Sequence, residues 1–110
     1  MHFEENDILL RIMLGENDML HGRPLYECIV QKARELELAG ATVLRGLMGF
    51  GADSRMHSAK LLSISSDLPI VIEIVDSQEH IDRLMPYLNE HLEEGTVTME
   101  AVHVHKYRRK

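Results

Sequence analysis

Alternating apolar and polar positions predict the sheet of this protein. Residues 8–14 alternate with period two and carry apolar side chains on both faces, which is typical of a strand. Residues 44–50 and 70–75 are rich in β-branched or bulky apolar residues between turn formers, so each is predicted to form a strand. A last strand is expected over residues 96–104, where an irregular alternation near Glu100 indicates a bulge.

Two amphipathic helices are predicted between these strands. Apolar residues recur at three- and four-residue steps over residues 25–38, and Gly40 follows as the expected left-handed cap residue. A second helix is expected to begin at Asp76, because Glu79 follows at the spacing of a capping box. Pro86 falls inside the apolar pattern of this helix and predicts a kink or a break before it.

The order strand, helix, strand, strand, helix, strand predicts an α+β fold of the ferredoxin-like type. In this βαββαβ arrangement a four-stranded antiparallel sheet has two helices on one face. A long loop joins the second and third strands. Residues 1–110 are long enough for one core, so the whole chain is expected to form a single domain.

The second face of the predicted sheet is left open although it carries apolar residues. Those expected there are Leu9, Met13, Val43, Leu47, Val71, Val75 and, as a further candidate, Met99. A bare apolar sheet face is rare on a monomer, so we expect other copies of the chain to cover it. The alternative is that the long loop folds back over this face.

Composition and charge exclude several classes of protein. The formal net charge of -6 argues against a general nucleic-acid binder, which needs a surplus of Lys and Arg. The N-terminal segment lacks a signal pattern and a long apolar run, so no membrane insertion is expected. Cys28 is the only cysteine, which excludes an intramolecular disulfide and agrees with an expected cytoplasmic location.

The connection between the second and third strands is the first candidate functional region. A connection of this length in so small a domain is usually functional or disordered. Arg55 and His57 have no evident core role there, and their donors would suit a phosphate group. Asp53 and Ser54 lie close to His57, but a flexible loop that carries a whole triad is a poor catalyst. We therefore do not expect an enzyme.

Two other arginines are candidate ligand contacts. Arg45 lies within a predicted strand, where it needs a sheet edge or a carboxylate such as Glu73. A structural ion pair is the preferred interpretation of Arg45, and contact with a ligand is the alternative. Arg108 belongs to a basic C-terminal segment on an acidic protein, which is a second place where a phosphate could bind.

The C-terminal strand also carries a histidine pair. His103 and His105 are two residues apart on a strand, so their side chains project to one face and can chelate a metal. No third ligand stands at a defined spacing from them. Ordinary surface histidines are therefore the preferred interpretation, and no metal site is predicted.

The glycine-rich motif at the start of the long loop carries a resemblance to a known family. The residues GLMGFG, followed by His57 and by DLPIVIEIVD, resemble the trimeric PII signal-transducer superfamily. The match is closer to a poorly characterised PII-like branch named domain of unknown function 190. The segments that carry it are GRPLYE at residues 22–27, GATVLRG at 40–46, MGFG at 48–51 and SRMHSAK at 54–60.

The resemblance implies a homotrimer with a small-effector site, such as one for an adenine nucleotide, in each cleft between subunits. Gly49, Phe50 and Gly51 match the loop base that lies against the ligand. The loop at about residues 49–60 would signal to a partner protein, such as a membrane transporter, a channel or an enzyme. Carboxylates at residues 93–94 stand where a phosphate-gripping lysine loop is expected, which favours AMP or ADP over ATP.

Two other functions remain open at this point. Trimeric copper-tolerance proteins have a similar topology, so a trimeric metal-binding protein is the alternative function, with the histidines as its motivation. A scaffold without a ligand is a third hypothesis, which would hold if side chains filled the clefts between subunits.

Overall fold

The computed structural model describes residues 1–52, 55–59 and 67–110 of the chain. The main strands are β1 (His2–Gly15), β4 (Thr42–Arg45), β7 (Pro69–Asp76) and β8 (Thr96–Tyr107), and the helices are α1 (Leu25–Glu35) and α2 (Gln78–His91). Two short hairpins complete the elements: β2 (Met19–Leu20) pairs with β3 (Arg23–Pro24), and β5 (Met48–Gly49) pairs with β6 (His57–Ser58).

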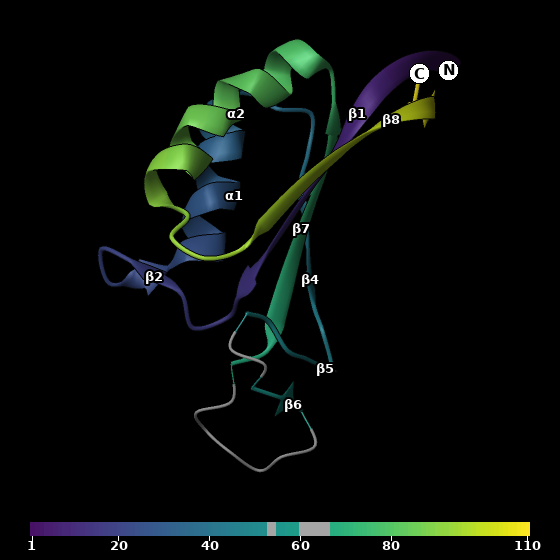
Figure 1. The fold of residues 1–110 in the computed structure, drawn as a ribbon. Helices are drawn as coiled ribbons and strands as arrows, with labels where there is room; N and C mark the ends of the chain where they lie inside the picture. Colours follow the sequence, from purple (N-terminus) through teal and green to yellow (C-terminus); the bar gives the residue numbers. More distant parts are fainter. Residues whose placement is uncertain (53–54, 60–66) are drawn as a thin grey trace.

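The four main strands form one antiparallel sheet in the order β4-β7-β1-β8, and both helices lie on the same face of it (Figure 1). This arrangement confirms the predicted ferredoxin-like fold. The alternation along β1 and β7 directs one set of side chains to the helices. The buried core includes Leu10, Ile12, Leu14, Ile70, Ile72 and Ile74 from these strands and Leu25, Ile29, Ala33, Ile81, Leu84 and Leu88 from the helices. Removal of these apolar side chains from water is the main force that holds the helices to the sheet.

The open face of the sheet carries the other set of alternating side chains. Leu9, Met13, Val71 and Val75 are half-buried there, as predicted. Arg11 and Glu73 lie between them as directly paired residues of β1 and β7, with Arg11 Nη2 donating to Glu73 Oε2 at 2.7 Å. The face is therefore apolar with one ion pair near its middle.

Three residues expected on the open face lie elsewhere. Directly paired residues share a face of the sheet, and Val43 pairs with Ile72 while Met99 pairs with Leu10, so both lie on the helix side. Leu44, opposite Val71, occupies the open face in place of Val43. Leu47 lies beyond the end of β4 and is 79% exposed.

The predicted strand over residues 44–50 is divided into two, and Gly46 explains the division. Its N–H donates to the Pro69 carbonyl at 2.7 Å, and a Cβ at Gly46 would lie 2.6 Å from Pro69 Cγ. Only a glycine allows this close approach. β4 therefore ends at Arg45, and the chain continues into the separate β5–β6 hairpin.

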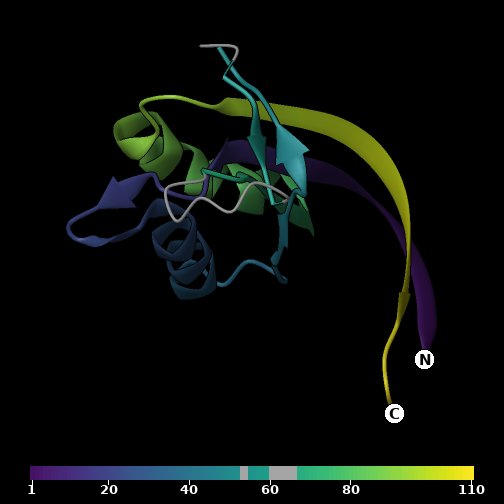
Figure 2. The ribbon, with the colours of Figure 1, turned by 90° about the horizontal axis from the view of Figure 1, so that it is seen from below.

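Strands β1 and β8 are longer than predicted and continue beyond the helices as a two-stranded arm, formed by residues 2–7 and 102–107. Figure 2 shows the two strands curving together away from the rest of the molecule. Their pairing is continuous from His2 opposite Tyr107 to Met13 opposite Thr96. The bulge predicted near Glu100 is therefore wrong, because every residue of β8 in this range has one partner in β1.

Helix α1 ends earlier than predicted, and Glu37 rather than Gly40 is the left-handed residue. Glu37 has a φ of 62°, and its N–H donates to the Arg34 carbonyl at 3.1 Å. The N–H of Leu38 donates to the Ala33 carbonyl at 3.0 Å, which completes a Schellman motif. Leu38 is buried with Ala33 in the core. This apolar contact sets the position of the turn, although no glycine stands there.

Helix α2 begins at Gln78 with Ser77 as its N-cap, not at Asp76. Ser77 Oγ accepts from the His80 N–H at 3.2 Å, so the predicted capping box with Asp76 is wrong. The helix continues through Pro86 without a break. Pro86 lies on the exposed side, where water can hydrate the carbonyl that the missing N–H leaves unpaired.

Asp76 instead joins three segments at the end of β7. Its carboxylate accepts from the N–H of Ala39 at 2.8 Å and of Ser77 at 2.7 Å, and it lies 2.9 Å from Nδ1 of His80. Burial alone would raise the pKa of Asp76, but these two N–H groups and the His80 ring outweigh it. The pKa of Asp76 therefore lies below its ordinary value of 3.8.

We expect Glu37→Gly to raise the free energy of unfolding by about 1 kcal/mol, because glycine avoids the steric cost of a left-handed conformation. Chemical denaturation of both proteins at equal concentration measures this difference. Gly40→Ala is the control and is expected to leave stability almost unchanged, because a Cβ there meets no atom within 4 Å. Destabilisation by Gly40→Ala without a gain from Glu37→Gly would contradict the assignment of the cap.

We expect Asp76→Ala to lower the free energy of unfolding at pH 7 by about 2 kcal/mol, because it leaves the N–H groups of Ala39 and Ser77 without their charged acceptor. The difference in the free energy of unfolding between the wild type and the variant should be complete above pH 3.8. It should decrease as the pH falls through the lowered pKa of Asp76. Denaturation curves at several pH values test this. Asp82→Ala, an exposed position on α2, is the control and should cost less than about 0.5 kcal/mol. An equal loss in both variants would refute the role of Asp76.

Candidate functional site

The candidate site lies at one end of the sheet, where the long connection leaves it. Gly15 at the end of β1 pairs with Pro69 at the start of β7, and Arg45 at the end of β4 pairs with Ile70. We call residues 46–51, 57–59 and 67–69 the loop base. In the part of the connection that the structure describes, the β5–β6 hairpin extends past the end of the sheet and leaves the open face uncovered (Figure 1). This part of the chain does not support the alternative of a loop folded over that face.

Within the loop base, two glycines lie against Pro69. Gly46 approaches it most closely, and a Cβ at Gly49 would lie 3.2 Å from Pro69 Cγ. The Ala59 N–H donates to the Leu47 carbonyl at 2.8 Å, which ties the two sides of the hairpin together. Gly49 therefore has a packing role in addition to the predicted ligand role. Gly51 has open space around its Cα, so a ligand can approach its backbone.

His57 is built into the loop base, whereas Arg55 is exposed. His57 is half-buried, and its Nδ1 accepts from the Asp67 N–H at 3.3 Å. This contact leaves Nε2 as the ring nitrogen available to a ligand. Arg55 stands two residues earlier with an exposed side chain. Asp53 and Ser54 lie outside the described residues.

Exposed apolar side chains lie on the loop base and next to it. Phe50, a predicted site residue, is 66% exposed, and Leu47, Met48 and Met56 are also exposed. We call these four residues the apolar patch. Sequence reasoning selected Phe50 alone, and the signal for two of the others was the run LMGF at residues 47–50. A cluster of exposed large hydrophobic residues indicates a surface that binds something.

Arg45 forms an ion pair, but with a partner other than Glu73. Its Nη1 donates to Glu16 Oε2 at 2.9 Å, and this hydrogen bond with the Glu16 charge raises the pKa of Arg45 above its ordinary value. Arg45 pairs with Ile70 and so lies on the helix side of the sheet, whereas Glu73 lies on the open face. The preferred interpretation of Arg45, a structural ion pair, is confirmed on the edge strand β4, but the carboxylate is Glu16 and not Glu73, which binds Arg11.

Carboxylates gather at the same end of the sheet. Asp18 accepts from the Gly15 N–H at 3.1 Å, and Asp67 accepts from the Asn17 N–H at 2.8 Å. The turn before β8 places the exposed residues 93–94, both glutamates, close to this end, because Thr96 at the start of β8 pairs with Met13. Among the residues that the structure describes around the loop base, carboxylates thus accompany the two cations Arg45 and Arg55.

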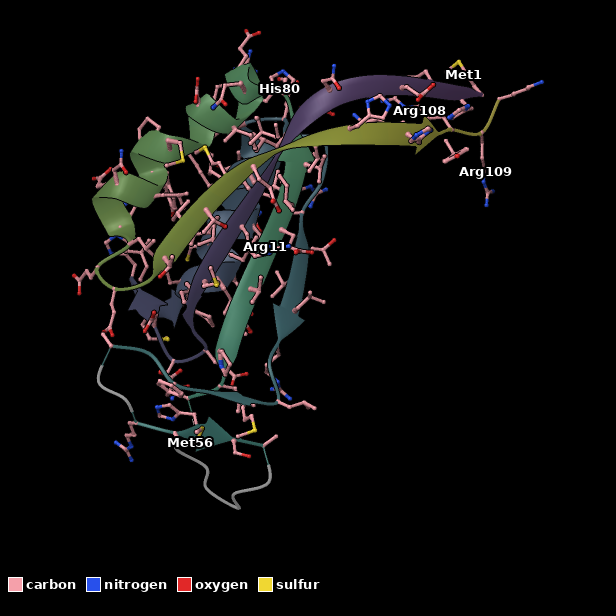
Figure 3. The ribbon with its side chains drawn as sticks, turned by 45° about the vertical axis from the view of Figure 1, so that its right-hand side comes forward. Met1, Arg11, Met56, His80, Arg108 and Arg109 are labelled. Carbon is pink, nitrogen blue, oxygen red and sulfur yellow. The ribbon has the colours of Figure 1, made fainter. Side chains whose placement is uncertain are left out.

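Arg108 does not join the other candidate residues within one chain. Figure 3 shows Arg108 at the tip of the arm and Met56 at the opposite end of the molecule. The Arg108 guanidinium carbon lies 5.1 Å from the centre of the Phe3 ring, a cation–π contact within the arm. Arg108 can reach a loop base only if that loop belongs to another copy of the chain.

None of the helices in the described part of the chain is both long and apolar enough to cross a membrane.

Comparisons with solved structures identify proteins of the same fold. The PII-like protein CPII from Thiomonas intermedia K12, bound to ADP and bicarbonate, superimposes with a TM-score of 0.69 at 19% identity, over 93% of this chain and 91% of that one. A second CPII structure contains ADP, AMP and bicarbonate and gives a TM-score of 0.66 at 20% identity, with the same coverage. A PII-like signalling protein described as putative, from Thermus thermophilus, gives 0.61 at 19% identity, over 94% and 91%.

Sequence comparisons identify the family. A UPF0166 protein of Aquifex aeolicus is 37% identical over 97 residues, which are 87% of this chain and 90% of that protein. A UPF0166 protein of Methanocaldococcus jannaschii is 32% identical over 99 residues, 89% of this chain and 91% of that one. The family model DUF190, described as "Uncharacterized ACR", matches residues 7–104. The chain therefore belongs to the DUF190 family, which the sequence motifs had indicated, and it has the fold of PII-like proteins.

Proposed function

We propose that this protein is a PII-like regulatory protein, not an enzyme, that binds an adenine nucleotide in clefts between the subunits of a homotrimer. The observation that carries this proposal is the open face of the sheet, which is apolar, is not covered by the described residues of one chain and is bordered by the exposed loop base. The bound state would be reported to a partner protein through residues 49–60. A membrane transporter, a channel or an enzyme would be such a partner.

The open face supports self-association. Leu9, Val71 and Val75 are half-buried on it, and Leu44 at its edge is 51% exposed. Soluble monomers rarely leave an apolar face of this kind bare, and closed symmetric oligomers cover it with a surface of another copy. The ion pair between Arg11 and Glu73 can be covered as well, because its two charges are already matched.

The chemistry of the loop base favours a nucleotide of low charge. The apolar patch offers Phe50 and Met48 to an adenine ring, and Gly51 leaves room for a close backbone contact. Arg55 and His57 would donate to phosphate, joined by Arg45 or by Arg108 of a neighbouring copy. The surrounding carboxylates repel each added phosphate charge, so AMP or ADP is preferred to ATP. The ADP and AMP present in the CPII structures support the same class of ligand at the level of the fold.

The position of the long loop supports a signalling role. The loop begins at the loop base. A nucleotide bound at the loop base would therefore also contact the segment that a partner meets. A ligand changes such a loop only by its different affinity for the loop conformations. Nucleotide binding and loop position are therefore expected to change together.

We expect Leu44→Lys to weaken the homotrimer, because it places a charge on the face that the copies cover. Sedimentation at micromolar concentration should give three times the mass of one chain for the wild type and a large monomer fraction for the variant. Val43→Lys is the matched control, because the side chain of Val43 lies on the helix side of the sheet. A monomeric wild type, or an equal effect of both variants, would refute the proposed interface.

We expect isothermal titration to detect AMP or ADP, with ATP weaker by about ten-fold because of the acidic surroundings of the loop base. Phe50→Ala should weaken AMP binding by about ten-fold through the loss of one stacking partner. Met19→Ala, which truncates an exposed apolar side chain outside the loop base, is the control. The absence of binding for all three nucleotides would refute the nucleotide site, and equal losses in both variants would refute the role of Phe50.

A further inference from the structure

The arm brings the C-terminal histidines next to acidic and amide side chains of the N-terminal strand. Glu4 pairs directly with His105, and Asn6 pairs with His103. Directly paired residues share a face, and so do residues two apart on one strand. One face of the arm thus carries His2, Glu4, Asn6, His103 and His105. The third ligand that spacing along the sequence did not supply comes from the other end of the chain.

The distances within this group match those between ligands of one metal ion. Glu4 Oε1 lies 2.8 Å from Nε2 of His103 and 3.4 Å from Nε2 of His105. One ligand atom from each of the three residues lies within 4.8 Å of the other two. In a tetrahedral zinc site with metal–ligand bonds of about 2.1 Å, neighbouring ligand atoms are about 3.4 Å apart. Small side-chain rotations would therefore place all three around one ion.

Each of the two histidines is also held by a partner on its other ring nitrogen. Nδ1 of His103 lies 3.0 Å from Asn6 Oδ1, and Nδ1 of His105 lies 3.1 Å from Nε2 of His2. The rings of His2 and His105 are stacked with an angle of 3° between their planes. Both contacts leave Nε2 directed toward Glu4. Metal-binding histidines are oriented in this way, by a hydrogen bond on the nitrogen that does not bind the metal.

We propose that Glu4, His103 and His105 form a binding site for a divalent transition-metal ion, with Zn²⁺ as the type ion. Imidazole nitrogens and a carboxylate oxygen suit zinc and its neighbours Cu²⁺ and Ni²⁺, whereas Mg²⁺ and Ca²⁺ prefer oxygen ligands alone. The three side chains are exposed, so the fourth position is open to water or to a group of another molecule.

The composition of this group distinguishes it from other histidines near acids. Within the described residues it is the only set of three potential ligands that lie this close together. His91 lies 3.7 Å from Glu90, but no third ligand joins them among the residues that the structure describes. Two cations of the arm belong to its opposite face, because Lys106 pairs with Phe3 and Arg108 stacks on the Phe3 ring. The site therefore does not compete with a large positive charge on its own face.

Titration of the metal-free, untagged protein with Zn²⁺ against a chromophoric chelator tests the site. We expect one Zn²⁺ per chain in the wild type. Glu4→Gln, His103→Gln and His105→Gln should each lower the affinity by more than about ten-fold, and Asn6→Ala by about ten-fold. Co²⁺ should give the visible spectrum of a four-coordinate ion, and Glu4→Gln should abolish it.

His91→Gln is the matched control, because it removes a histidine–glutamate pair without touching the arm. It should bind Zn²⁺ as the wild type does. Circular dichroism should show that all variants keep the fold, since the arm lies outside the core. Zn²⁺ affinity that survives Glu4→Gln, or that falls equally in His91→Gln, would overturn the proposal. AMP binding should be unaffected by Glu4→Gln, so failure of the nucleotide site would not decide the metal site.

Discussion

The helices of this protein cover one face of a sheet that is apolar on both faces, and the rest of the structure depends on this imbalance. Helices α1 and α2 bury one set of alternating side chains and cannot reach the other. Leu9, Val71 and Val75 consequently stay at the surface of a single chain, around the ion pair of Arg11 and Glu73. A second copy is the simplest apolar surface that matches them, and any cleft so formed opens beside the loop base.

The order of elements follows from local patterns, but the faces of the edge strands do not. A shift of one residue in pairing moves a side chain to the other face of a sheet. Whether Val43 or Leu44 points to the open face depends on pairing with β7, and the end of β4 depends on the contact of Gly46 with Pro69. The pairing of β4 with β7 and the contact of Gly46 with Pro69 join residues far apart in the sequence, so no local pattern predicts them. The cap at Glu37 escaped prediction because burial of Leu38 outweighs the usual preference for glycine.

The two candidate sites differ in how much of each was visible in the sequence. Gly49, Phe50 and Gly51 were selected as ligand-site candidates through family resemblance, but the packing of Gly49 on Pro69 was not foreseen. The histidine pair was visible from its spacing alone. Its third ligand is Glu4, which is 99 residues away from His103 and becomes a neighbour only through antiparallel pairing of the first and last strands.

The arm has a further consequence for local dynamics. A ribbon of only two strands is marginally stable without a covering layer, so its backbone hydrogen bonds open more readily than those of the sheet beneath the helices. A metal ion bound between β1 and β8 would stabilise the paired form of the arm, because a ligand that binds only this form shifts the equilibrium toward it by mass action. Amide hydrogen exchange in the arm would then depend on metal concentration, while exchange in the helix-covered core would not.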